Sequence, residues 1–169
     1  SSKEVAACLM LSDWQTGETV VPEHVGGFNK YNWEIEQKRV GLLTRKVFQW
    51  VETERHGHNI QDLHVLVLGD IISGELHDDN KMNNEFPAPV ALVKAAYLMG
   101  GQILALASMF RTVHVHEMHI DNHARLTKKP QWTGGAENSL NYPFFALLNE
   151  ILKQQDNVQP HPSLSIKEQ

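Results

Sequence analysis

The sequence lacks features that would place it in several protein classes. It has one cysteine, Cys8, in 169 residues, which excludes an internal disulfide and a zinc-ribbon framework and fits a reducing compartment. The opening stretch "SSKEVAACLMLSD" has a short apolar run without a basic leader, and no apolar segment approaches the length that spans a bilayer. We therefore expect a cytoplasmic protein with no membrane partner.

The sequence also lacks an excess of basic residues. Its formal net charge of −5 argues against general electrostatic adhesion to nucleic acid. A nucleic-acid substrate is still compatible with this charge, because bound metal ions change the local charge of an acidic site. No glycine-rich phosphate loop follows the first apolar run, which ranks a doubly wound nucleotide- or protein-binding module last among the functions considered.

What the chain does have is the composition of one soluble globular domain, 41% hydrophobic and 21% charged. A chain of this length can bury a sizeable core without a disulfide or a structural metal, and we treat residues 1–169 as a single domain. Ten histidines is a high count, which favours metal binding slightly.

The apolar pattern alternates between strands and helices. Continuous apolar runs predict strands buried on both faces at residues 5–13 and 62–70, and period-two alternation predicts a strand at 112–120. Residues 163–168 are expected to form a short final strand. Apolar residues at helical spacing predict three helices, at residues 33–55, 90–110 and 139–155. In the first helix the apolar stripe from Trp33 to Trp50 is expected to lie in the core.

Alternating strands and helices indicate an α/β fold with a largely parallel sheet and crossover helices. In such sheets ligands bind beyond the carboxyl ends of the strands. Here those ends read "LSDWQ", "LGDIISGELH" and "IDNHAR", and all three carry residues of the kinds that ligate metals. This coincidence predicts a site at one edge of the sheet.

The residues at these ends suit phosphoryl chemistry. Asp13 and Asp70 can each ligate a divalent cation, and Gln15 or Asn122 can add a carboxamide oxygen. Two such ions roughly 3.5–4 Å apart clamp a phosphoryl group and activate a water. His123 is then placed to hydrogen-bond a leaving-group or phosphate oxygen, and Arg125 to pair with phosphate.

Ordinary turn chemistry remains an alternative at each position. Asp13 and Asp70 can cap the turns after their strands, and Asn122 with His123 can form a simple Asn-containing turn. The basic stretch from Arg125 to Lys129 is either a guide for phosphate or a solvated patch. His77 is either a phosphate contact or an exposed loop residue. Two further histidines share one strand face, which we expect to be solvated or covered by a partner; they are His114 and His116.

The three stretches "LSDWQTGE", "LGDIISGELH" and "DNHARLTKK" resemble motifs of the calcineurin-like metallophosphoesterases, and more narrowly a phage-type, DNA-repair-exonuclease-like branch. That family has Asp-x-His, Gly-Asp-x-x-[Asp/Ser]-Gly and Gly-Asn-His motifs, in this order, on a four-layer αββα sandwich. The branch has Gln in place of the first His, as Gln15 is here, and Ser followed by Gly in the second motif, as Ser73 and Gly74 are. The resemblance covers nearly all of the chain.

The resemblance implies a dinuclear site. Asp13 and Gln15 would hold one ion, Asp70 would bridge both, Asn122 would hold the other, and His123 would assist catalysis. The ions implied are two Mn²⁺, with Mg²⁺, Fe or Zn²⁺ as alternatives. The substrate implied is a phosphate ester, DNA among the candidates, and for a phage-encoded protein the compartment is the host cytoplasm.

The chain departs from the family pattern in two ways. Asp121 occupies the position of the glycine in the third motif, where it is tolerated in a turn, adds a carboxylate or distorts the loop. The chain also matches only the N-terminal βαβαβα half of the sandwich, and the second sheet with its further histidines is expected to be missing. The alternative function is therefore a catalytically incomplete or split subunit, whose open sheet face is covered by another copy or by a complementing chain.

Overall fold

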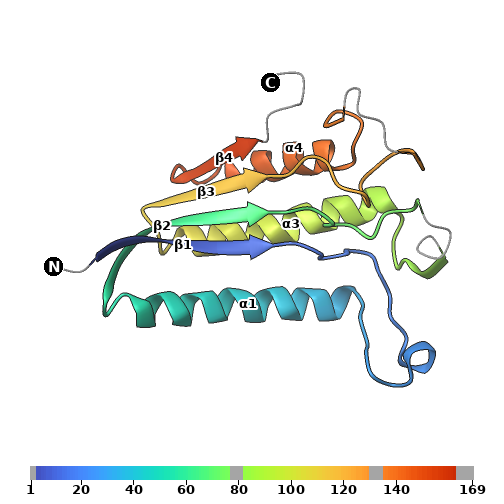
Figure 1. The fold of residues 1–169 in the computed structure, drawn as a ribbon, viewed down its shortest axis with the longest axis horizontal. Helices are drawn as coiled ribbons and strands as arrows, with labels where there is room; N and C mark the ends of the chain where they lie inside the picture. The colour runs from blue at the N-terminus through green and yellow to red at the C-terminus, as the bar shows by residue number, and fades with distance from the viewer. Residues whose placement is uncertain (1–2, 77–81, 130–134, 163–169) are drawn as a thin grey trace.

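The computed structural model describes residues 3–76, 82–129 and 135–162 (Figure 1). They form an α/β fold around one four-stranded sheet in which every neighbouring pair is parallel. The strands are β1 Lys3–Leu11, β2 His58–Val67, β3 Thr112–Glu117 and β4 Val158–Pro162. The helices are α1 Trp33–Glu54, α3 Ala88–Ala107 and α4 Asn141–Leu152, with a short 3-10 helix η1 at Pro22–Val25. The predicted α/β class and parallel sheet are confirmed.

The last strand of the sheet differs from the prediction. The expected strand at residues 163–168 lies outside the described residues, and β4 precedes it in the chain. β4 contains Pro160 and Pro162, which lack a backbone N–H, and it is accordingly an edge strand beside β3. The sequence analysis missed it because two prolines in five residues argue against a strand.

The three α-helices that the structure describes, α1, α3 and α4, cover the same face of the sheet. The strand order β1-β2-β3-β4 never reverses, and crossovers of one hand then place every connecting helix on one side. In Figure 1, α3 and α4 lie behind the strands. The expectation that the first two strands are buried on both faces is therefore wrong. In β1, Ala7 and Leu11 are buried whereas Met10, pointing to the other face, is 68% exposed.

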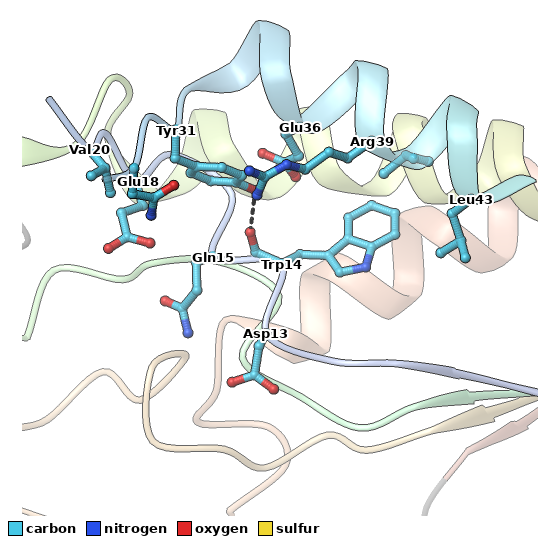
Figure 2. A pocket seen from close by; sticks show the side chains of 11 residues that line it. Asp13, Trp14, Gln15, Glu18, Val20, Tyr31, Glu36, Arg39 and Leu43 are labelled. Carbon is cyan, nitrogen blue, oxygen red and sulfur yellow. Dashed lines mark hydrogen bonds between the residues drawn. The ribbon is translucent and has the colours of Figure 1, made fainter. Parts of the chain in front are cut away.

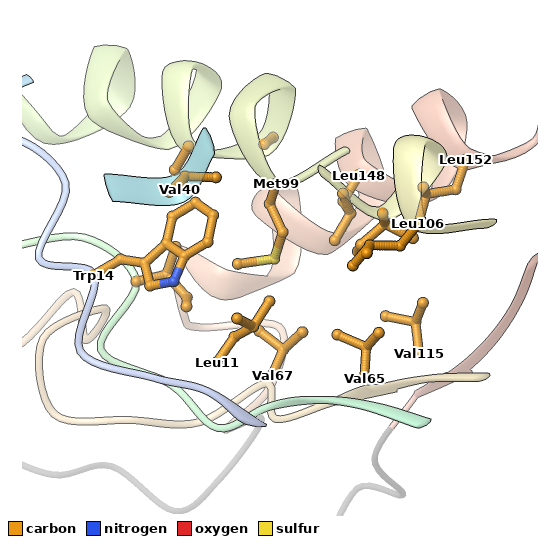
Figure 3. Close-up of a cluster of buried hydrophobic side chains, with 14 of the residues drawn as sticks. Leu11, Trp14, Val40, Val65, Val67, Met99, Leu106, Val115, Leu148 and Leu152 are labelled. Carbon is orange, nitrogen blue, oxygen red and sulfur yellow. The ribbon is translucent and has the colours of Figure 1, made fainter. Parts of the chain in front are cut away.

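The hydrophobic core lies between this sheet face and the helices (Figure 3). Val65, Val67 and Val115 of the strands face Met99 and Leu106 of α3. The absence of any membrane-length apolar segment was also a wrong expectation, since α3 has 20 residues and a mean hydropathy of 1.6 over its most apolar window. That window is 56% buried, as expected of the central helix of a core.

The buried face of α1 is offset from the predicted apolar stripe. The helix begins at an N-cap, Asn32, whose side chain accepts a hydrogen bond from Ile35 N at 3.0 Å. Its buried residues are Glu36, Val40 and Val51, while Trp50 of the predicted stripe is 52% exposed. Val40 belongs to both sets, whereas Val51 is buried in place of Trp50 and the buried Glu36 lies outside the apolar pattern.

Candidate active site

The loops after β1 and β2 continue the parallel pairing beyond the strands. Asp13 N donates to Gly69 O at 3.2 Å, Gln15 N to Asp70 O at 3.1 Å and Thr16 N to Ile71 O at 2.8 Å. These hydrogen bonds hold the two loops side by side at the carboxyl edge of the sheet. The first two predicted strand ends are therefore brought together as expected from a parallel sheet.

Three of the predicted site residues have an unfavourable backbone conformation. Asp13, Gln15 and Asp70 have φ angles of 54°, 51° and 51°, and they are the non-glycine residues with positive φ in the described part of the chain. This left-handed region costs roughly 1–2 kcal/mol for a residue such as Gln15, and aspartate tolerates it better. Backbone strain of this kind clusters at functional sites, where the surrounding structure sustains it.

The carboxyl group of Asp70 has an unsatisfied atom. Its Oδ1 is buried and has no hydrogen-bond partner within the described residues, which is costly unless a cation or a donor binds there. Burial raises the pKa of Asp70 above its usual value, with smaller contributions from the nearby Asp121 and Asp13 carboxylates, while His123 opposes the rise. Residues of all three loops therefore act on this one carboxyl group.

Asp121, the departure from the family motif, joins the second loop to the third. Its Oδ2 accepts hydrogen bonds from Asp70 N at 2.8 Å and from Asn141 Nδ2 at 2.7 Å. Its Oδ1 accepts from Ala124 N at 2.6 Å. The Asp121 carboxylate thus holds the turn from Asp121 to Ala124 and also the backbone of Asp70. It therefore connects the third loop to the second.

His123 is oriented by the second loop. Its Nδ1 lies 2.7 Å from the carbonyl oxygen of Ser73, so the Nδ1 proton is donated there and Nε2 is left for other partners. Gly74 makes this approach possible: it has φ +74°, and a Cβ at its position would lie 2.3 Å from the carbonyl oxygen of His123. The Ser-Gly pair in "DIISG" therefore serves the placement of His123.

Asn122 and Arg125 lie further out on the third loop. The side chain of Asn122 is exposed. Arg125 Nε donates to Asn122 O at 3.2 Å, which turns the guanidinium back along its own loop. Arg125 also pairs with Ser139 through an isolated antiparallel bridge, an anchor that sequence analysis did not find.

The donors at this edge are mostly single carboxylates and amides. Within residues 3–76, 82–129 and 135–162, no three His, Cys, Asp or Glu side chains are grouped so that they could hold one metal ion. An ion held by Asp13 and Asp70 would therefore need amide oxygens such as that of Gln15.

A pocket lies on the other side of the loop that carries Asp13 and Gln15 (Figure 2). We call it the α1 pocket; its volume is about 470 Å³, and it is lined by α1 and the chain from Asp13 to Tyr31. Figure 2 shows Trp14 on the α1 side of the loop, while the side chains of Asp13 and Gln15 point away from α1. The loop from Asp13 to Gln15 therefore separates the α1 pocket from the candidate active site.

Glu36 is the buried acid of this pocket, and sequence analysis missed it. It is 2% exposed; its Oε1 accepts a hydrogen bond from the Thr16 hydroxyl, and its Oε2 has no partner. Burial raises the pKa of Glu36 to about 7, and the hydrogen bond from Thr16 opposes this rise. The Tyr31 hydroxyl donates to Trp14 O at 2.7 Å, and its own pKa is raised by burial and by Glu36.

Four histidines lie on the sheet face that is not covered by α1, α3 or α4. We call His64, His114, His116 and His161 the histidine face. His64 pairs in register with His114, and His116 with His161. Ring nitrogens of His64 and His116 are 2.9 Å apart, and those of His114 and His161 are 3.0 Å apart. The prediction that His114 and His116 share one face is confirmed, while His77 lies outside the described residues.

Comparison with protein-family models, with curated proteins and with solved structures gave no match.

Proposed function

We propose that the chain is a metal-dependent phosphoesterase of the calcineurin-like type, a phosphodiesterase or nuclease acting on a phosphate ester such as DNA. The observation that carries the proposal is the backbone at the strand ends. The non-glycine residues with positive φ in the described part of the chain are Asp13, Gln15 and Asp70, three of the four positions that the motif resemblance assigns to the metals, the fourth being Asn122. Aspartate is tolerated in this region in ordinary turns, whereas glutamine is uncommon there, so Gln15 is the position that a simple turn does not explain.

The residues present fit hard divalent cations. The unpartnered buried Oδ1 of Asp70, the carboxylate of Asp13 and the amide oxygen of Gln15 are donors that Mn²⁺ and Mg²⁺ accept. Asp70 would bridge two ions, with Asn122 serving the second. When bound, such ions polarise a phosphoryl oxygen and lower the pKa of water.

The chain's own residues supply the remaining chemistry. With its Nδ1 proton committed to Ser73 O, the imidazole of His123 offers Nε2 to the substrate, where its protonated form can donate to a leaving alkoxide. Arg125 lies in the same loop, and its guanidinium would pair with a phosphate oxygen once it releases Asn122 O. Asp121 keeps the backbone of Asp70 in place while charge builds at the site.

The test combines binding with turnover. Mn²⁺ titration calorimetry after chelator treatment should show binding to the native chain and its loss in Asp70→Asn. Hydrolysis of bis(p-nitrophenyl) phosphate with Mn²⁺ should fall in parallel. Asp156→Asn is the matched control, because Asp156 is an exposed acid before β4, at the opposite edge of the sheet. Equal Mn²⁺ binding by all three proteins, or none by the native chain, would contradict the proposal.

A second candidate function is an incomplete or split phosphoesterase-like subunit that acts by association. Met10, 68% exposed, and the histidine face lie on the sheet side without helices. A second copy or a complementing chain would remove this surface from water. Sedimentation velocity that shows a monomer at all concentrations, without binding of a hydrophobic dye, would contradict self-association.

A further inference from the structure

We infer that the α1 pocket binds a guanine base, and that this base belongs to the substrate whose phosphate lies at Asp13 and Gln15. The second half of the inference rests on the proposed function; the first half does not. The pocket volume of about 470 Å³ lies within the range of roughly 300–1,000 Å³ for small-molecule sites.

Glu36 requires a ligand that donates hydrogen bonds. Its Oε2 is buried, already out of contact with water and without a hydrogen-bond partner among the described residues, in a residue that is 2% exposed. A purely apolar occupant, such as an acyl chain, would leave this oxygen unsatisfied. A guanine base presents two N–H donors along one edge, both suited to a carboxylate.

Arg39 offers hydrogen-bond donors to the neighbouring edge of a ligand. It follows Glu36 by three residues on α1, so both side chains leave the same side of the helix about one turn apart. Both line the pocket, and the Arg39 guanidinium lies 5.3 Å from the centroid of the Tyr31 ring. Guanine carries O6 and N7 beside its N–H edge, and arginine is their commonest partner. A guanidinium or ammonium ligand would satisfy Glu36 but meet repulsion from Arg39.

The remaining lining favours a flat ring over a bare phosphate. Trp14, Val40 and Leu43 supply apolar surface against which a ring can lie. The side chain of Asp13 points across the loop (Figure 2); of the other charged lining residues two are acids, Glu18 and Glu36, and one is a cation, Arg39, so a free phosphate would be repelled. A nucleotide avoids this conflict by placing its base in the pocket and its phosphate across the loop, where Asp13 and Gln15 point (Figure 2).

The first experiment measures binding of nucleosides, which have no phosphate, to the full chain by titration calorimetry at pH 8 in EDTA. Guanosine should bind at least about tenfold more tightly than adenosine or cytidine, the effect of one differential hydrogen bond to a charged group. Glu36→Gln should weaken guanosine binding by at least about tenfold, because one acceptor becomes a donor. Glu34→Gln, an exposed acid on the same helix paired with Lys38, should bind as the native chain does.

The outcomes separate the base site from the phosphoesterase. Equal affinity for all nucleosides, no guanosine binding, or unchanged binding by Glu36→Gln would each overturn the inference. If Glu36→Gln does not fold by circular dichroism, Arg39→Met gives the same test, because Arg39 is exposed. Guanosine binding without hydrolysis of bis(p-nitrophenyl) phosphate leaves the base site standing and overturns the proposed function. Hydrolysis without guanosine binding overturns the base site alone.

Discussion

Substitution of Asp121 by alanine should destabilise the fold substantially, because this one carboxylate connects two loops. It accepts three hydrogen bonds of 2.6–2.8 Å, two from the backbone N–H groups of Asp70 and Ala124 and one from Asn141. Removing a charged acceptor costs about 1.5–3 kcal/mol per hydrogen bond when the donors stay buried. Asp121 is partly exposed, so water will replace some of these bonds, and we expect a net loss of about 2–4 kcal/mol.

Urea denaturation followed by circular dichroism measures this loss. With a slope of about 2 kcal/mol per M, the midpoint should fall by about 1–2 M. Asp121→Asn, which keeps one acceptor oxygen, should lie between the native chain and the alanine variant. Asn122→Ala is the control: its side chain is exposed, and the change should stay within about 0.5 kcal/mol. A midpoint for Asp121→Ala equal to that of Asn122→Ala would refute the bracing role.

Three further changes test the strain, the loop packing and the histidine face. Gln15→Gly should raise the free energy of unfolding by about 0.5–1 kcal/mol, since release of the left-handed strain outweighs the added chain entropy. Asn29→Gly, in the following loop without positive φ, should lower the free energy of unfolding. A fall in the thermal midpoints of both variants would contradict the strain argument. Gly74→Ala should lower the free energy of unfolding by about 3 kcal/mol or more, because the added Cβ would lie 2.3 Å from His123 O at φ +74°. Gly57→Ala, whose Cβ would meet no described atom within 4 Å, should lower it by less than about 0.5 kcal/mol in the same urea assay. Burial and the neighbouring histidines hold the pKa values of His114 and His116 below their usual value, so the unfolded chain binds these protons first as pH falls through about 6.5. Stability should therefore fall between about pH 7 and pH 5 in urea titrations, and the His114→Gln/His116→Gln double variant should show a weaker fall; identical pH profiles would argue against the histidine face as the cause.

Local sequence patterns predicted the elements well and their surroundings less well. The period-two alternation of "TVHVHE" gave β3, and the acids after the apolar runs gave the two loops that the structure holds side by side. The same apolar runs suggested strands buried on both faces, yet Met10 is exposed. Whether helices cover one face or both faces of such a strand depends on the strand order of the sheet, which no local pattern encodes.

Two site features depended on contacts between distant residues. Asp121 looked like a defect in a motif, but its partners Asp70 and Asn141 lie 51 and 20 residues away. Glu36 looked like a solvated charge on an amphipathic helix, but Thr16 and the Trp14 loop enclose it. A sequence gives residue types and spacing along the chain, whereas both roles arise from neighbours that only the fold brings close.

The strand order of the sheet also has a consequence for biosynthesis. Because each strand pairs with the one that precedes it in the chain, a strand leaving the ribosome meets a partner that has already emerged. Pairing never has to wait for a later segment, unlike sheets whose central strand is made last. The sheet can therefore grow from β1 toward β4 at the pace of translation, so the loops that carry Asp13 and Asp70 can be paired before β3 is made.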